Sequence, residues 1–201
     1  MRYLLIILLL FIAAAVSADP TRDFYEATKI GDVSLMETKL KPGVKIDAQF
    51  DHGFTPLIAA AGSGHKDAVI FLLKKGASIN KKSQDGFTAL YAAARFNQVE
   101  CASILLQAGA SINEADVDGL TPLMTASSQG HKAMVALLLE NEADTSLKSK
   151  NGLDAFDFAH NKERKEVMRM LDPERAVIND IPLSEALILA DFRDSNGVRD
   201  P

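Results

Sequence analysis

The sequence predicts an all-α fold in which helix pairs stack into a solenoid, because most of the chain repeats itself every 33 residues. Four glycines and four alanines keep this spacing without drift: Gly53, Gly86, Gly119 and Gly152, and Ala60, Ala93, Ala126 and Ala159. Paired leucines keep the same step at Leu72–Leu73, Leu105–Leu106 and Leu138–Leu139. A constant period indicates units that each pack on their neighbours, whereas a single closed core would show no such repeat.

One unit, residues 85–117, shows how local signals divide it. A glycine turn leads to Thr88, whose hydroxyl can cap a helix by accepting a backbone hydrogen bond. The pattern predicts a first helix at 89–96 and a second helix at 99–107, each with apolar side chains directed to the core. Gly109 then ends the second helix, and a polar loop closes the unit.

These residues resemble the ankyrin repeat. The similarity rests on TPLIAA at 55–60, Gly-His at 64–65, the paired leucines and GASIN at 76–80, and it covers about residues 24–171. It implies an ankyrin-repeat solenoid with β-hairpin-like loops that project from one side. It also implies that loop tips and first helices line a concave face, and that the histidine of the Gly-His pair has a structural hydrogen-bonding role.

Length and composition indicate one soluble domain behind a short leader. The repeat register gives a signal peptide at 1–18, a repeat domain at 19–171 (N-terminal cap 19–50, repeats 51–84, 85–117 and 118–150, C-terminal cap 151–171) and a tail at 172–201. The caps carry polar substitutions where only one neighbour is present. Prolines break up the tail, but 184–192 can form a short helix. That helix either docks on the last repeat, which we favour, or reaches a partner.

The first 18 residues have the composition of a secretory signal peptide. Arg2 supplies a positive charge, residues 4–16 are an unbroken apolar run, and small residues precede a cleavage site after Ala18. The run of 13 residues is shorter than the ~20 that a membrane-crossing helix needs. The sequence therefore predicts export to the bacterial periplasm or out of the cell, with no membrane anchor after cleavage.

The sequence contains no recognisable catalytic or cofactor-binding pattern. None of its four histidines has the spacing of a zinc site, and no glycine-rich loop suits a phosphate. The one cysteine, Cys101, is expected to pack on a second helix, so an enzyme built on this thiol is the less favoured alternative. Glu114, Asp116 and Asp118 share a loop that could attract a cation, but their spacing lacks the calcium-loop pattern. We therefore expect no enzymatic activity, no cofactor and no metal.

The charge of the chain argues against nucleic acid as the partner. Without the leader it has 27 acidic and 21 basic side chains (22 less Arg2), a net charge of −6. A phosphate backbone requires a concentrated basic face instead. Basic and acidic loop residues alternate along the predicted rim, which favours another protein as the partner of a monomeric chain.

Candidate binding residues are those that vary between repeats at positions the framework does not require. They are Phe54, Ile58, Phe87, Tyr91, Arg95, Phe96, Leu120, Met124 and Gln129. On the middle repeat, Phe87, Tyr91 and Arg95 are spaced i, i+4 and i+8, so they form one stripe of residue types that carry interface energy. The alternative is that Phe54 and Phe87 are partly buried and only support the neighbouring loop. Phe50, at a loop tip, is a lesser candidate.

From these observations the sequence predicts a non-enzymatic protein that binds another protein through its concave face. The specific hypothesis is an inhibitor or protector that binds a peptidoglycan-cleaving enzyme of the cell wall. One alternative, suggested by similarity to exported ankyrin proteins, is an accessory protein that supports an oxidative-stress enzyme such as catalase. Another is a secreted effector that binds a host protein.

Overall fold

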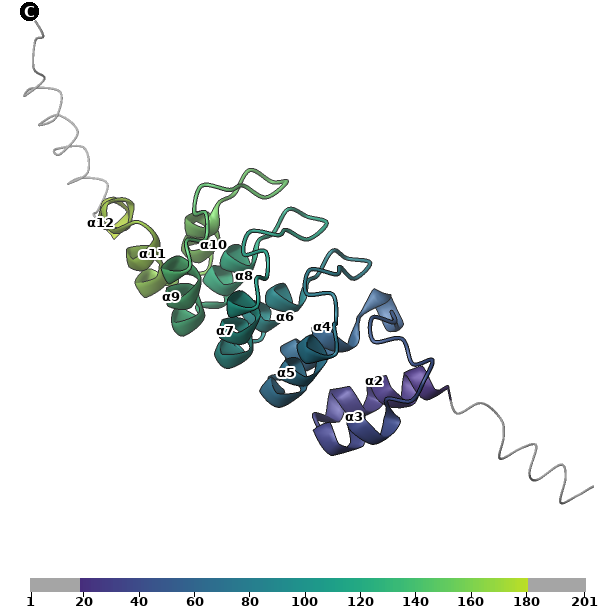
Figure 1. Ribbon diagram of the computed structural model, residues 1–201. Coiled ribbons are helices and arrows are strands. Elements are labelled where there is room, and N and C mark those ends of the chain that lie inside the picture. The colour runs from purple at the N-terminus through teal and green to yellow at the C-terminus, as the bar shows by residue number, and fades with distance from the viewer. Residues whose placement is uncertain (1–18, 181–201) are drawn as a thin grey trace, which may run out of the picture.

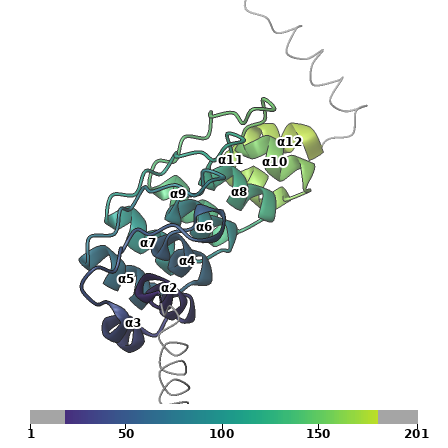
Figure 2. The ribbon, with the colours of Figure 1, turned by 90° about the vertical axis from the view of Figure 1, so that its right-hand side faces the viewer.

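A computed structural model describes residues 19–180 as a stack of helix pairs, and no β-strand occurs in this part of the chain. The helices form two rows, with loops that project from the side of the first helices (Figures 1 and 2). The first helices are α2 (Pro20–Ile30), α4 (Pro56–Ser63), α6 (Ala89–Arg95), α8 (Pro122–Gln129) and α10 (Ala155–Asn161). The second helices are α3 (Val33–Lys39), α5 (Lys66–Lys74), α7 (Val99–Gln107), α9 (Lys132–Glu140) and α11 (Lys165–Leu171). A 3₁₀ turn, η1 (Asp51–Gly53), precedes α4, and α12 (Pro173–Asp180) follows the last pair. The predicted all-α solenoid is confirmed.

Local capping explains where the first helices begin. The Thr88 side chain accepts a hydrogen bond from the backbone N–H of Tyr91, as Thr55, Thr121 and Asp154 do for their own helices. The predicted second helix at 99–107 has those bounds in the structure, whereas the first helix ends one residue earlier than expected, at Arg95. Across residues 19–180 no helix is both long enough and apolar enough to cross a membrane.

The two rows pack differently because their core side chains differ in size. The recurring alanines of the first helices, which are Ala60, Ala93, Ala126 and Ala159, are completely buried. In each leucine pair the first member, such as Leu105, is completely buried and the second, such as Leu106, is half-buried. First helices contact one another more extensively than second helices do, which favours curvature of the stack toward the first helices.

Hydrogen bonds join each repeat to the one before it. Four equivalent side chains each bond a backbone carbonyl 36 residues earlier: His65 to Lys29 (2.9 Å), Gln98 to Gly62 (3.4 Å), His131 to Arg95 (3.2 Å) and Arg164 to Ser128 (3.3 Å). Because a carbonyl can only accept, the Nε2 of each histidine is the donor. The structural role that the family resemblance implied for the histidines is therefore present in the structure.

The loops are joined to one another in the same way. The N–H of Gln84 donates to the carbonyl of His52 at 2.9 Å, and the N–H of Val117 donates to that of Asp85 at 3.0 Å. Gly86 lies at this contact with a left-handed φ of +83°, and a Cβ added there would lie 2.9 Å from the Cα of Asp116. Glycine is required here by both conformation and space.

Replacement of Gly86 tests this loop contact. Gly86→Ala should lower the free energy of unfolding by more than the ~1–2 kcal/mol expected for left-handed strain alone, because the methyl group also displaces the backbone of the next loop. Gly76→Ala is the matched control, since Gly76 has a φ of +85° but no atom within 4 Å of an added Cβ. Urea unfolding of both variants measures the difference, and equal losses would contradict the close approach.

The C-terminal end of the described chain is closed by α12, a helix that the sequence analysis did not predict. We expected Pro173 to disrupt this segment, but proline fits the first turn of a helix, and the Asp172 side chain caps the turn by accepting from the N–H of Arg175 at 2.9 Å. Ala176 of α12 is buried. The predicted helix at 184–192 and the predicted signal peptide at 1–18 lie outside the described residues.

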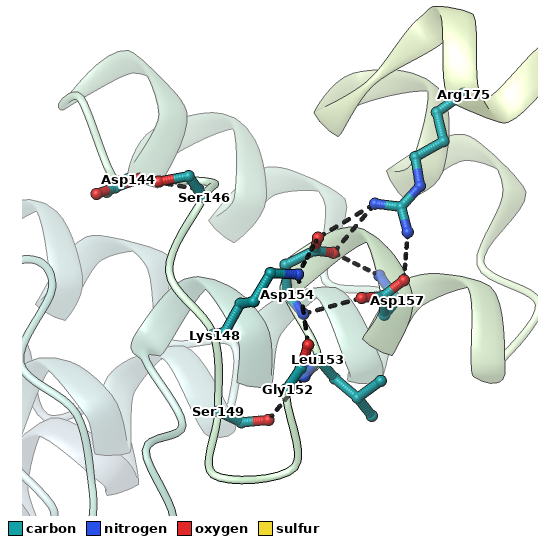
Figure 3. Close-up of polar contacts among 9 residues, drawn as sticks. All are labelled: Asp144, Ser146, Lys148, Ser149, Gly152, Leu153, Asp154, Asp157 and Arg175. Carbon is teal, nitrogen blue, oxygen red and sulfur yellow. Dashed lines mark hydrogen bonds and ion pairs between the residues drawn. The ribbon is translucent and has the colours of Figure 1, made fainter.

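Arg175 fixes α12 to the start of α10, as Figure 3 shows. Its guanidinium donates to both carboxylate oxygens of Asp154, at 3.3 and 3.2 Å, and also to Asp157. Its Cζ lies 4.2 Å from the centre of the Phe156 ring. Burial acts to raise the pKa of Asp154, but the N–H of Asp157, then Arg175 and Lys148, outweigh it and leave this pKa below its ordinary value.

Removal of the Arg175 side chain should loosen α12. We expect Arg175→Ala to lower stability by about 1–3 kcal/mol and to speed amide exchange in α12. Because the pKa of Asp154 is lowered by folding, its contribution is present at neutral pH and is lost as the pH falls below 3.8, its ordinary value. Stability of the wild type should therefore fall more steeply than that of the variant on acidification.

Lys148→Ala is the control for this prediction. Its amine is 3.4 Å from Asp154, but its side chain is 57% exposed, so its loss should change stability by less than ~1 kcal/mol. Equal effects of the two variants would show that α12 does not depend on Arg175.

Candidate functional site

The inner face, defined as the surface of α4, α6, α8 and α10, holds the predicted binding residues, but the structure does not expose all of them. The buried members are Ile58 (1% exposed), Tyr91 (2%) and Met124 (1%). The half-buried members are Phe54, Phe87 and Leu120, and the exposed members are Arg95, Phe96 and Gln129. The expectation that Ile58, Tyr91 and Met124 present their side chains to a partner is therefore corrected, because contacts within the stack cover them.

Tyr91 shows how this burial arises. Its ring stacks on that of Phe87, with centroids 4.6 Å apart and an angle of 6° between planes. Its hydroxyl donates to Asp116 of the following loop at 3.0 Å. Burial raises the pKa of Tyr91 to about 12. Tyr91 thus connects α6 to the next repeat, and Phe87 packs between it and Phe54, whose ring centroid is 6.2 Å away.

The acidic loop that could have attracted a cation is bonded within the protein. Asp116 accepts from Tyr91 and from the N–H groups of Asp118 and Leu120, both at 2.9 Å. Glu114 forms an ion pair with Lys82 at 2.6 Å. Between residues 19 and 180 there is no group of three or more His, Cys, Asp or Glu side chains that could hold a metal ion.

Two other candidates of the sequence analysis, Cys101 and Phe50, make packing contacts within the protein. Cys101 is 1% exposed, and burial, with a smaller contribution from Glu100, raises its pKa to about 11. Its thiol therefore stays protonated at neutral pH and is a poor nucleophile. Phe50 is half-buried and stacks on Tyr25 with ring centroids 4.2 Å apart, so it is not the free loop aromatic that was expected.

Arg95 and Phe96 form the exposed part of the predicted stripe. The Cζ of Arg95 lies 5.6 Å from the centre of the Phe87 ring and 5.9 Å from that of Phe96, which is within cation–π range. Phe96 is 58% exposed, and its ring lies over Gly62, where an added Cβ would be 3.5 Å away. Arg95 forms no ion pair with any residue of the described segment 19–180.

A pocket of about 210 Å³ lies beside Arg95. Its walls include Tyr91 of α6, Leu120 and Met124 at the start of α8, and Phe158 of α10. Phe158 was missed by the sequence analysis. A signal was available, because an aromatic residue stands there where the preceding repeats have Ala92 and Thr125.

A larger hollow, of about 570 Å³, lies on the opposite side of the stack between α3 and α5. Acidic and basic side chains share its lining, with Glu37 and Asp67 beside Lys74 and Lys75. No described residue there is an exposed large apolar group or an arginine. The inner face is therefore the better candidate for recognition.

Comparison with known proteins agrees with the geometry. Family descriptions for ankyrin repeats match twice, as ankyrin repeats (3 copies) over residues 24–116 and as ankyrin repeats (many copies) over residues 96–139. The chain is thus an ankyrin-repeat protein over this combined span, and its described part is an ankyrin-repeat solenoid. Ankyrin repeats are protein-binding modules and are generally non-enzymatic, so the partner class is protein.

Curated relatives add little beyond the repeats. The chain is 42% identical over 50 residues to the protein named ankyrin repeat, SAM and basic leucine zipper domain-containing protein 1 of Homo sapiens, Nomascus leucogenys and Pongo abelii. The match covers 25% of this chain and 10% of each relative. This chain therefore spans about a tenth of the length of those relatives.

Tyr91→Phe tests the structural role of Tyr91. Loss of the hydroxyl should lower stability at neutral pH by about 1.5–3 kcal/mol, because its acceptor is a charged carboxylate. The folded chain keeps this proton up to a pKa of about 12 instead of 10.0, so wild-type stability should fall between those pH values, and the fall should be smaller in the variant. Chemical unfolding at pH 7 and above pH 10 measures both effects.

Tyr25→Phe is the control, since no hydrogen bond from its hydroxyl occurs in the described chain. It should change stability by less than ~0.5 kcal/mol at neutral pH. A similar loss in both variants would show that the bond to Asp116 has no special weight.

Proposed function

We propose that this chain is exported and binds another protein through the part of the inner face around Arg95 and Phe96. The observation that carries the proposal is the combination of an exposed aromatic ring, an arginine without an ion-pair partner in the described chain, and an adjacent pocket with both apolar and polar walls. Aromatic residues and arginine contribute most of the binding energy in many interfaces. Because repeat contacts hold this surface in place, binding costs little ordering entropy.

Export is proposed from the leader. A positive residue, an apolar run at 4–16 and small residues before Asp19 are the features of a cleavable signal. The functional chain would then be residues 19–201, acting in the bacterial periplasm or outside the cell. Its partner must be present in the same compartment.

The partner we propose is a peptidoglycan-cleaving enzyme of the cell wall, which the chain would inhibit or protect by covering its surface. A preformed binding face without catalytic groups suits a stoichiometric blocker, because such a protein acts only by occupying a surface. The two other candidates are support of an oxidative-stress enzyme such as catalase and binding of a host protein. All three share the same surface and differ in the partner.

Affinity capture from a periplasmic extract tests the proposal. Residues 19–201 of the wild type should capture one enzyme and inhibit or preserve its peptidoglycan-cleaving activity at a molar ratio near one. The double variant Arg95→Gln/Phe96→Ser should lose at least ~90% of the captured partner, because removal of a hot-spot pair costs more than the ~1.4 kcal/mol that a tenfold loss represents.

The matched control is Lys74→Gln/Val177→Ser, which removes one exposed cation and one exposed apolar side chain away from the inner face. It should capture as the wild type does, and thermal unfolding should confirm that both double variants are folded. Equal capture by the wild type and the Arg95/Phe96 variant would overturn the placement of the site. Capture of catalase, or capture from host extract alone, would favour the corresponding alternative.

A further inference from the structure

We propose that the pocket beside Arg95 binds a peptide segment of the partner in which a carboxylate stands next to a large apolar side chain. This inference rests on the proposed protein-binding function of the inner face and specifies the chemistry that the partner must present. It is argued from the arginine, from the size of the pocket and from the charges around it.

The Arg95 guanidinium is positioned to bind an anion. Its guanidinium lies near two rings, at 5.6 and 5.9 Å from their centres, and its backbone carbonyl accepts from His131 of the next repeat at 3.2 Å. Elsewhere in the described chain Arg22 and Arg175 pair with aspartates, whereas Arg95 pairs with none there. A planar guanidinium matches a carboxylate through two parallel hydrogen bonds, so a carboxylate is the group it lacks.

The size of the pocket indicates a side chain as its occupant. At about 210 Å³ it falls below the ~300–1,000 Å³ of sites for drug-sized molecules, so a single side chain suits it better than a whole small molecule. Leu120, Met124 and Phe158 supply apolar walls. One leucine, methionine or phenylalanine side chain fits this space and this lining.

The charges around the pocket favour one carboxylate over a polyanion. Arg95 is the single charged residue of the lining, so a nucleic acid or a highly phosphorylated chain would find one cation where it needs several. Ser128 and Gln129 at the pocket offer a hydroxyl and an amide, and these groups can bond the backbone of a bound peptide. The pocket therefore fits a short acidic and apolar protein segment.

Peptide selection tests the inference. A library of random heptapeptides displayed on phage is selected against residues 19–201 of the wild type, of Arg95→Gln and of Arg95→Glu. The wild type should enrich peptides with Asp or Glu directly beside Leu, Met or Phe. A synthetic copy of the best peptide should bind Arg95→Gln about tenfold or more weakly, as expected for loss of a charge-assisted hydrogen bond.

Arg95→Glu supplies the sharper outcome, because it should reverse the charge preference. Its enriched peptides should contain Lys or Arg beside the same apolar residues. Ser128→Leu, which narrows the pocket, should instead keep the acidic preference and lose the apolar one. Enrichment of peptides without an acidic residue, or an unchanged preference in Arg95→Glu, would overturn the inference, as would the absence of any enriched peptide.

Failure of the inference and failure of the proposed function are distinguishable. If peptide selection ignores Arg95 while the Arg95/Phe96 variant still loses its captured protein, the carboxylate chemistry is wrong and the binding face stands. If selection reverses as expected but no exported protein is captured, the chemistry stands and the proposed function is wrong. Displacement of the selected peptide by a synthetic peptide of residues 181–201 would make the chain's own tail the occupant, and would overturn the assignment to a separate partner.

Discussion

The distance between neighbouring first helices constrains the rest of this structure, and alanine side chains set that distance. Ala60, Ala93 and their equivalents on the first helices are completely buried, and a larger residue would push neighbouring helices apart. Only at this spacing do successive loops lie close enough for Gly86 to be required, and only at this spacing does the Tyr91 hydroxyl reach Asp116 of the next loop. The shape of the inner face is therefore a product of repeat packing.

Contacts that every repeat makes were predictable from the sequence. Each such contact requires the same residue type in every repeat, so that residue recurs at a fixed period. The caps at Thr88 and its equivalents follow from this, as does the second helix at 99–107. The helix α12 was not predictable in this way. It occurs once, and Arg175 fixes it to Asp154 and Asp157 by contacts that have no counterpart in the other repeats. A periodic pattern carries no information about such a contact.

The candidate site was predicted in part, because a helical spacing indicates which residues lie on one side of a helix but not whether they are exposed. The spacing of Phe87, Tyr91 and Arg95 predicted one stripe, and in the structure Phe87 does contact the other two, although it precedes the N-cap of α6 and is not part of the helix. Their exposure depends on the neighbouring repeat, which the spacing does not describe. The loop that contains Asp116 lies against Tyr91 and covers it, whereas Arg95, one turn further along the helix, lies beyond that loop and remains exposed.

Burial of Tyr91 favours recognition at Arg95, even though it removes a ring from the surface. The Phe87 ring is stacked on the buried Tyr91 ring and lies 5.6 Å from the Cζ of Arg95. This contact restricts the arginine side chain, so less rotamer entropy is lost when a ligand binds. The positions equivalent to Arg95 in the two adjoining repeats are Gly62 and Ser128, neither of which carries a charge. Two units away the equivalents are Asn161 and Lys29, and Lys29 forms an ion pair with Glu26. The framework is thus shared by the repeats, while an arginine stands at this position on the middle repeat alone. In the proposed binding mode, specificity therefore depends on a residue that departs from the repeat pattern and that contacts between repeats hold in position.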